Sequence, residues 1–387
     1  MNFSDDCQNK SVNFTKFVNL FGDFMGVYEA FTIKGSLHRI IIPIWLILGI
    51  PGSIFCVIVW TRPKMLHTSS VYLAALGASD LGFFICQFVW FLKTAWRIDL
   101  LNVPVLCELF AVINFFLQYL SPLFTFAFTL ERFILICFPF KGERFLSVPR
   151  AITVTLVITL IAFLLSLIQG YFFEYKEEIK ECIERSSVVQ EGTWQNRLLF
   201  YWNLITETVI FGLIPLSILI LNLFVIKETK ILQSNAPVKF KLIENRQNVI
   251  NSKTTDNRNA STTVMLLSIS FYFILSTLPV TIMQLLIIHN FWNGDECLTV
   301  TEVYSDPIWQ AHFKAVNVKS VIETLALSHY SAKFYIYMIT GVQFRIQFLN
   351  IFKRHSNKQI LFRRNGLESQ NLSLDNYRSL EASNKTV

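Results

Sequence analysis

Seven long apolar segments divide this chain and limit what it can fold into. They cover about residues 39–61, 68–93, 103–137, 149–172, 197–227, 260–290 and 314–340. A run of about 20 apolar residues is long enough to cross a bilayer as a helix. Within the membrane a helix satisfies all of its own backbone polar groups. The chain is therefore predicted to be an all-α protein, a seven-transmembrane helix bundle.

The seventh segment is the least apolar, because polar and charged side chains interrupt it. They are Lys314, Lys319, Glu323, His329 and Lys333. Ionisable groups are costly in hydrocarbon and usually face the interior of a helix bundle. This helix is therefore expected to turn its polar groups away from lipid.

The loops between the segments give the orientation. The stretch 227–259 and the tail after residue 341 are basic, whereas the stretches 172–196 and 290–314 are acidic. Because basic loops tend to stay in the cytoplasm, the N-terminus is predicted outside and the C-terminus inside. The net charge of +7 arises from these loops, so no nucleic-acid partner is expected.

The predicted organisation has four parts. They are an extracellular tail (1–36), the transmembrane domain (37–341), a short amphipathic helix eight (342–355) and a cytoplasmic tail (356–387). The first tail carries three glycosylation sequons, at Asn2, Asn9 and Asn13. In helix eight one apolar face is expected to lie on the inner leaflet; it consists of Phe344, Phe348, Ile351 and Phe352.

No enzymatic pattern stands out in the sequence. It contains no metal-ligand cluster, nucleophile elbow or His-Glu-x-x-His pattern. The chain is therefore not expected to be an enzyme, and neither a metal nor another cofactor is expected. A transporter remains a remote alternative, although no internal repeat is visible.

The third segment carries the clearest resemblance. In "TLERFILICFPF", residues 129–140, Glu131, Arg132, Phe133 and Pro139 resemble the acid–Arg–aromatic motif of rhodopsin-like (class A) G protein-coupled receptors. The chain is most similar to the invertebrate neuropeptide receptors of that family. The resemblance implies that these residues couple the receptor to a heterotrimeric G protein at the plasma membrane. It also implies that Glu131 holds Arg132 at rest, and that phosphorylated residues of the tail recruit arrestin.

The resemblance extends to the extracellular cysteines. Cys107 lies 25 residues before Arg132, where the family has its helix-three disulfide cysteine, and Cys182 is the implied partner. Cys7 and Cys297 are candidates for a second bridge. Spacing alone does not establish that connection.

Other positions match the family or depart from it. Asp80 matches the aspartate of the second helix, and Pro215 and Pro279 match the hinge prolines of the fifth and sixth helices. Thr277 stands where the sixth helix normally has a tryptophan, and Lys333 stands where the seventh normally has an asparagine. These departures keep a signalling-impaired receptor fold as an alternative.

Lys333 has two interpretations. In the family its position faces that of Asp80, beside a sodium site that a helix-three serine, here Ser121, also lines. The first interpretation is that the Lys333 ammonium occupies the sodium site and forms an intramembrane ion pair with Asp80, since buried charges need partners. The other is that Lys333 extends toward the cytoplasmic surface.

The resemblance also implies a ligand pocket. Its candidate residues are Asn114, Gln118, Glu207, Gln284 and Glu323. Asn114 replaces the aspartate of amine receptors, which argues against an amine ligand. The carboxylates and the acidic outer loops favour a cationic ligand, such as a short cationic or amidated neuropeptide. A non-peptide ligand is the alternative for the receptor as a whole. For Glu323 the alternative is an internal ion pair with Lys319, one helical turn earlier.

Overall fold

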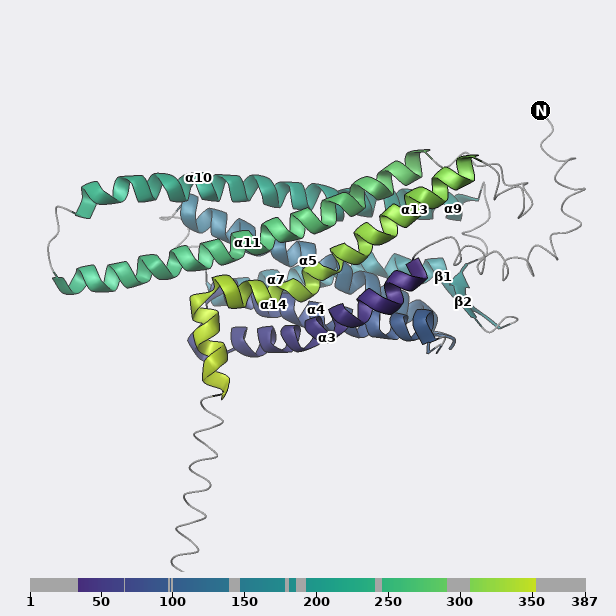
Figure 1. Cartoon of the computed structure of the whole chain (residues 1–387), viewed down its shortest axis with the longest axis horizontal. Coiled ribbons are helices and arrows are strands. Elements are labelled where there is room, and N and C mark those ends of the chain that lie inside the picture. Colours follow the sequence, from purple (N-terminus) through teal and green to yellow (C-terminus); the bar gives the residue numbers. More distant parts are fainter. Residues whose placement is uncertain are drawn as a thin grey trace, which may run out of the picture.

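The computed structural model describes residues 34–65, 67–96, 98, 100–138, 147–177, 181–185, 193–240, 246–290 and 307–352. Its helices run side by side along the long axis of the molecule (Figure 1). They are α3 (Lys34–Trp60), α4 (Thr68–Trp96), α5 (Leu106–Cys137), α7 (Val148–Phe172), α9 (Trp194–Thr206), α10 (Ile214–Phe240), α11 (Arg246–Asn290), α13 (Pro307–Ala326) and α14 (Ser328–Thr340). A short 3-10 helix, η1 (Pro63–Met65), joins α3 to α4.

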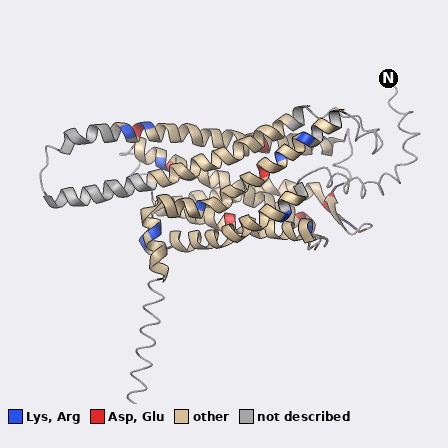
Figure 2. Cartoon of the chain, in the orientation of Figure 1, with Lys and Arg blue, Asp and Glu red and all other residues tan. Residues whose placement is uncertain are grey.

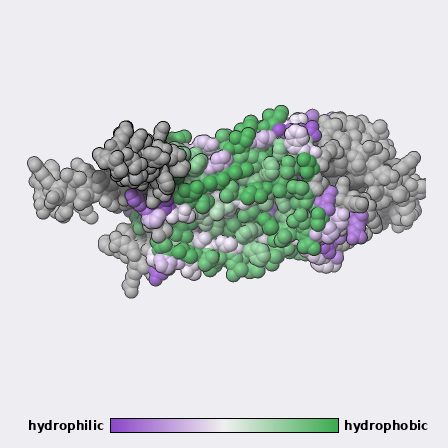
Figure 3. Space-filling model, turned by 90° about the horizontal axis from the view of Figure 1, so that it is seen from below, coloured by the Kyte–Doolittle hydropathy of each residue, from purple (hydrophilic) through white to green (hydrophobic). Residues whose placement is uncertain are grey.

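Apolar side chains cover the middle of the face seen in Figure 3 and mark the membrane region. Six helical stretches are long and apolar enough to cross a membrane, within the described residues. Many of their apolar side chains point outward; Ile47, for example, is 71% exposed and Leu275 is 73% exposed. Such exposure is stable when the neighbour is lipid. Together α13 and α14 form the seventh, more polar span, as its sequence indicates.

The helix α5 lies at the centre of the packing and contacts α4, α7 and α10, while α3 packs against α4 and α14. A two-stranded antiparallel sheet covers one end, formed by β1 (Phe173–Lys176) and β2 (Glu181–Glu184). By the charge of the loops, this end is the outer one. At the opposite end the chain turns away from the bundle after α14 (Figure 1).

Pro215 and Pro279 lie where the two prolines were expected, in the fifth and sixth spans. A π-helix, η2 (Glu207–Leu213), links α9 to α10 just before Pro215. Proline has no backbone N–H, so it interrupts the regular hydrogen-bond ladder, and a wider turn before it accommodates the ring. Pro279 lies inside α11. The fifth span is therefore three joined pieces rather than one uniform helix.

The helices of the fifth and sixth spans are longer in the structure than the sequence predicts. The fifth was expected to end near residue 227 and the sixth to begin near residue 260, whereas α10 continues to Phe240 and α11 begins at Arg246. Hydropathy detects only the part of a helix that lies in lipid. Polar residues beyond the membrane continue these two helices without changing the apolar signal.

The predicted apolar face of helix eight is partly wrong. In the helix 342–352 the Phe344 side chain is 1% exposed, and its ring packs 5.4 Å from Trp60 and 5.2 Å from Tyr337. Phe348 packs edge-on against Phe55 at 5.1 Å. These rings therefore dock helix eight onto the bundle. Phe352 of the predicted face is exposed as expected, and Val342, Ile346 and Leu349 are the other exposed apolar residues, suited to face lipid.

Several predicted features lie outside the described residues. They are the sequons at Asn2, Asn9 and Asn13, the cysteines Cys7 and Cys297, Pro139, and residues 353–387.

The close contact between α3 and α4 depends on a glycine. A β-carbon added at Gly49 would lie 2.1 Å from Cζ of Phe84. Phe84 is 2% exposed and packs edge-on against Tyr330 at 6.3 Å, so its ring has little room to move. Gly212 differs, because the nearest atom to an added β-carbon there is 3.6 Å away.

We predict that Gly49→Ala destabilises the bundle by about 1–3 kcal/mol, the usual cost of overpacking a filled core. Gly212→Ala is the matched control, because its new methyl group makes an ordinary contact. Thermal unfolding of the detergent-purified protein measures both. Equal melting temperatures for the two variants would contradict the packing described for Gly49.

Candidate functional site

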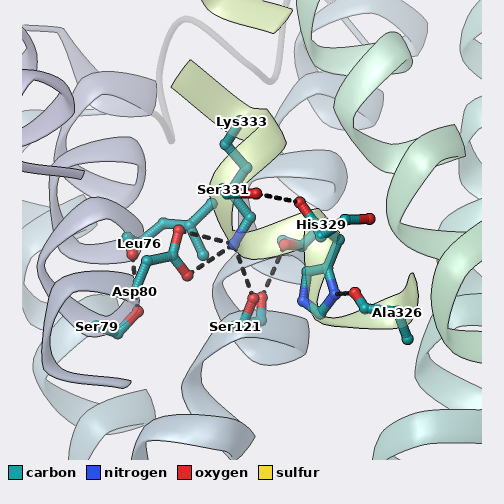
Figure 4. A network of polar contacts seen from close by, with 10 residues as sticks. Leu76, Ser79, Asp80, Ser121, Ala326, His329, Ser331 and Lys333 are labelled. Carbon is teal, nitrogen blue, oxygen red and sulfur yellow. Dashed lines mark hydrogen bonds and ion pairs between the residues drawn. The ribbon is translucent and has the colours of Figure 1, made fainter. Parts of the chain in front are cut away.

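Charged side chains are sparse along the middle of the bundle (Figure 2), yet two of them meet there. Lys333 Nζ lies 2.7 Å from Asp80 Oδ1 and 2.8 Å from Asp80 Oδ2. It lies 3.0 Å from Ser121 Oγ (Figure 4). Lys333 is 3% exposed and Asp80 is 2% exposed. All three donors of the ammonium therefore have an acceptor, and the lysine points into the bundle rather than toward the cytoplasm.

A break in the seventh span positions Lys333. The helix α13 ends at Ala326 and α14 begins at Ser328, with a turn at Leu327 between them. The Ser328 hydroxyl lies 2.6 Å from the Tyr272 hydroxyl of α11, which anchors the break. Neither proline nor glycine marks this position in the sequence.

A cavity of about 480 Å³ lies between the charge pair and the outer end. Volumes of this size are typical of small-molecule and cofactor sites. Four of the five predicted pocket residues line it: Asn114, Gln118, Glu207 and Glu323. Gln284 is not among its lining residues. The cavity also has lining residues that the sequence interpretation did not place there, among them Gln87, Lys93, Thr277, His329 and Tyr330.

The two pocket carboxylates differ in their partners. Glu323 Oε1 lies 3.2 Å from Lys319 Nζ, one helical turn earlier. Glu323 therefore lines the cavity and also forms the internal pair that was its alternative interpretation. Glu207 has no ion pair within the part of the chain that the structure describes. Of the two, Glu207 is better placed to receive a cation from outside.

The outer hairpin closes over this cavity. The disulfide between Cys107 at the start of α5 and Cys182 in β2 is confirmed, and Phe173 and Cys182 line the cavity. The backbone N–H of Cys182 donates to Asn102 Oδ1 at 3.2 Å. The bridge and this hydrogen bond hold the hairpin against the mouth of the pocket.

At the inner end, the described residues show no hydrogen bond or ion pair between Glu131 and Arg132, so the holding role that the resemblance implied stays a prediction. Glu131 Oε1 accepts a hydrogen bond from Ser69 Oγ at 2.5 Å. Glu131 Oε2 and Arg132 Nε have no hydrogen-bond partner among the described residues. Adjacent residues on a helix point in different directions, so the acid reaches α4 instead of the neighbouring guanidinium. Phe133 packs edge-on against Phe138 at 5.8 Å.

Arg132 borders a small gap between three helices. Its other lining residues include Asn222 of α10 and Thr263 of α11. The amide nitrogen of Asn222 is buried without a hydrogen-bond partner in the described part of the chain.

Comparison with known families decides the classification. The family model "7 transmembrane receptor (rhodopsin family)" matches residues 53–316, well over half of the chain. The chain belongs to the rhodopsin family of seven-transmembrane receptors. This confirms the resemblance seen in the third segment. The family consists of multi-pass membrane receptors, not enzymes. The plasma membrane is the typical location of this family.

Two kinds of curated relatives are similar to the receptor at low identity. Growth hormone secretagogue receptor type 1 of Oryctolagus cuniculus and of Homo sapiens is 26% identical over 182 residues, covering 43% of this chain and 50% of the relative. The FMRFamide receptor of Drosophila melanogaster is 23% identical over 331 residues, covering 79% of this chain and 52% of the relative. The receptor thus spans about half the length of the relatives it matches.

We predict that breaking the charge pair costs more than removing it. Lys333→Ala leaves the Asp80 carboxylate buried and unpaired, at a cost of about 3–5 kcal/mol. The double variant Asp80→Asn with Lys333→Asn removes both charges, so it should unfold at a higher temperature than Lys333→Ala. Ser79→Ala is the control, because the Ser79 hydroxyl donates only to the Leu76 carbonyl at 2.9 Å. A Lys333→Ala receptor as stable as wild type would contradict the pair.

We also predict that sodium does not stabilise the wild-type receptor. The ammonium of Lys333 already fills the space beside Asp80 and Ser121, so a second cation there would be repelled. Lys333→Asn frees both oxygen ligands and should gain stability in sodium chloride relative to choline chloride at equal ionic strength. Melting temperatures in the two salts measure this. Sodium-dependent stabilisation of wild type would contradict the prediction.

Proposed function

We propose that the receptor binds an extracellular peptide carrying a cationic side chain and signals through a heterotrimeric G protein. The observation that carries this proposal is Glu207, a carboxylate that lines a cavity of about 480 Å³ and has no ion-pair partner among the described residues. A guanidinium pairs with a carboxylate through two parallel hydrogen bonds. An arginine side chain entering below the hairpin therefore suits this site.

Two further observations support a peptide. The outer loops 172–196 and 290–314 are acidic in sequence and would attract a cationic ligand toward the mouth of the pocket. One relative is named for FMRFamide. In one-letter code this name spells a tetrapeptide amide with arginine at its third position. Coupling to a G protein is supported by the family and by the gap that Arg132 shares with α10 and α11.

The test is a calcium and cyclic-AMP readout in cells that express the receptor. The probe is a pool of amidated tetrapeptides with arginine at the third position, FMRFamide included. The expected result is a response to the pool whose potency falls at least about tenfold in Glu207→Gln, equivalent to about 1.4 kcal/mol. Glu323→Gln should lose less, because Glu323 is already paired with Lys319.

A shape-matched control without the charge isolates the proposed contact. The same pool with citrulline in place of arginine has the shape of arginine without its charge. It should be equally weak on wild type and on Glu207→Gln, because the coupling between the two changes reports their direct interaction. Silence of the arginine pool, with receptor present at the cell surface, would contradict the proposal and favour a non-peptide ligand or a receptor that no longer signals.

A further inference from the structure

Thr277 leaves space at the inner end of the ligand cavity. Its side chain is 6% exposed, and its hydroxyl donates to the Phe273 carbonyl of the same helix at 2.9 Å. Thr277, His329 and Tyr330 line one cavity together with Glu207 and Glu323. A large ring at position 277 would fill this part of the cavity. With the short threonine, the cavity extends from the two carboxylates to the side chain of His329.

His329 is a buried base with an unused acceptor. Its Nδ1 lies 2.7 Å from the Ala326 carbonyl oxygen. Because a carbonyl only accepts hydrogen bonds, Nδ1 carries the proton and Nε2 is an acceptor. Nε2 is buried and has no hydrogen-bond partner among the described residues. A buried polar atom without a partner is unfavourable, so a donor that reaches Nε2 would gain affinity.

The surroundings select an uncharged donor. Lys333 follows His329 by one helical turn, and its ammonium is already satisfied by Asp80 and Ser121 (Figure 4). A ligand cation at His329, or a proton on Nε2, would place a second positive charge near this ammonium in a poorly hydrated interior. The group that reaches Nε2 must therefore donate a hydrogen bond and be neutral.

The rings around His329 restrict its movement. Its ring centre lies 5.3 Å from that of Phe273 and 3.9 Å from that of Tyr330. The Tyr330 ring stacks in turn on Phe83 at 4.1 Å. His329 is thus held in place by packing and by its Nδ1 hydrogen bond. Because Nε2 is buried, a ligand group reaches it by displacing neighbouring side chains slightly.

We propose that His329 Nε2 receives a hydrogen bond from the terminal carboxamide of a peptide ligand, and that this contact makes the receptor select amidated peptides over free acids. The inference rests on the proposed function. The carboxamide is neutral, slim and a donor, as the site requires. A terminal carboxylate is ionised, cannot donate, and would direct its lone pairs at the lone pair of Nε2.

The experiment compares the arginine tetrapeptide pool as C-terminal amides and as free acids on each variant. The ratio of the two potencies is taken within one variant, so differences in surface expression cancel. Wild type should prefer the amide pool by at least about tenfold, a usual effect for a site that leaves a buried group unpaired. His329→Phe keeps an aromatic ring without the acceptor, and its ratio should fall close to one.

Two variants of Thr277 test whether its small side chain allows a ligand group to approach His329. Thr277→Trp should refill the inner part of the cavity and also remove the amide preference. Thr277→Val keeps the size of the side chain and should keep the preference. An amide preference that is absent in wild type, or that survives in His329→Phe, would overturn the inference while a response to either pool still supports the proposed function. Silence of both pools on wild type would instead count against the proposed function itself.

Discussion

The ammonium of Lys333 is the interaction on which the rest of this bundle depends. It joins three helices, since Asp80 lies on α4, Ser121 on α5 and Lys333 on α14. Each charge alone would be costly at this depth. Together, with the serine hydroxyl, they leave no unpaired donor on the ammonium. The pair thereby allows a span too polar for lipid to serve as the seventh helix.

The pair also shapes what a ligand meets. Tyr330 contacts both the charge pair and the ligand cavity. Its ring centre lies 5.1 Å from Lys333 Nζ, and its side chain lines the cavity. His329 borders the same cavity and points no charge into it. The pocket therefore combines Glu207, a carboxylate that no described residue pairs with, with a neutral acceptor deeper in the bundle. This arrangement suits a ligand with one cationic side chain and one uncharged polar end.

Much of the architecture can be predicted from the sequence, and each feature that was not predicted has an identifiable physical reason. Hydropathy predicts the spans because lipid-facing surface must be apolar, and a lone lysine among apolar residues predicts a buried partner. Periodicity does not predict the break at Leu327, which rests on the tertiary contact between Ser328 and Tyr272. The docked face of helix eight was misassigned, because lipid and a protein core both attract phenylalanine. That Thr277 and His329 line one cavity becomes visible only once α11 and α14 are brought together.

Lys333 takes the place of a bound cation between Asp80 and Ser121 in the middle of the bundle. The most direct measurement is a high-resolution structure of the purified receptor in sodium-containing buffer. We expect Lys333 Nζ to lie within hydrogen-bond distance of both oxygens of Asp80 and of Ser121 Oγ, with no density for an ion beside Asp80. A lysine side chain turned toward the cytoplasmic surface, with an ion or ordered water beside Asp80, would contradict it.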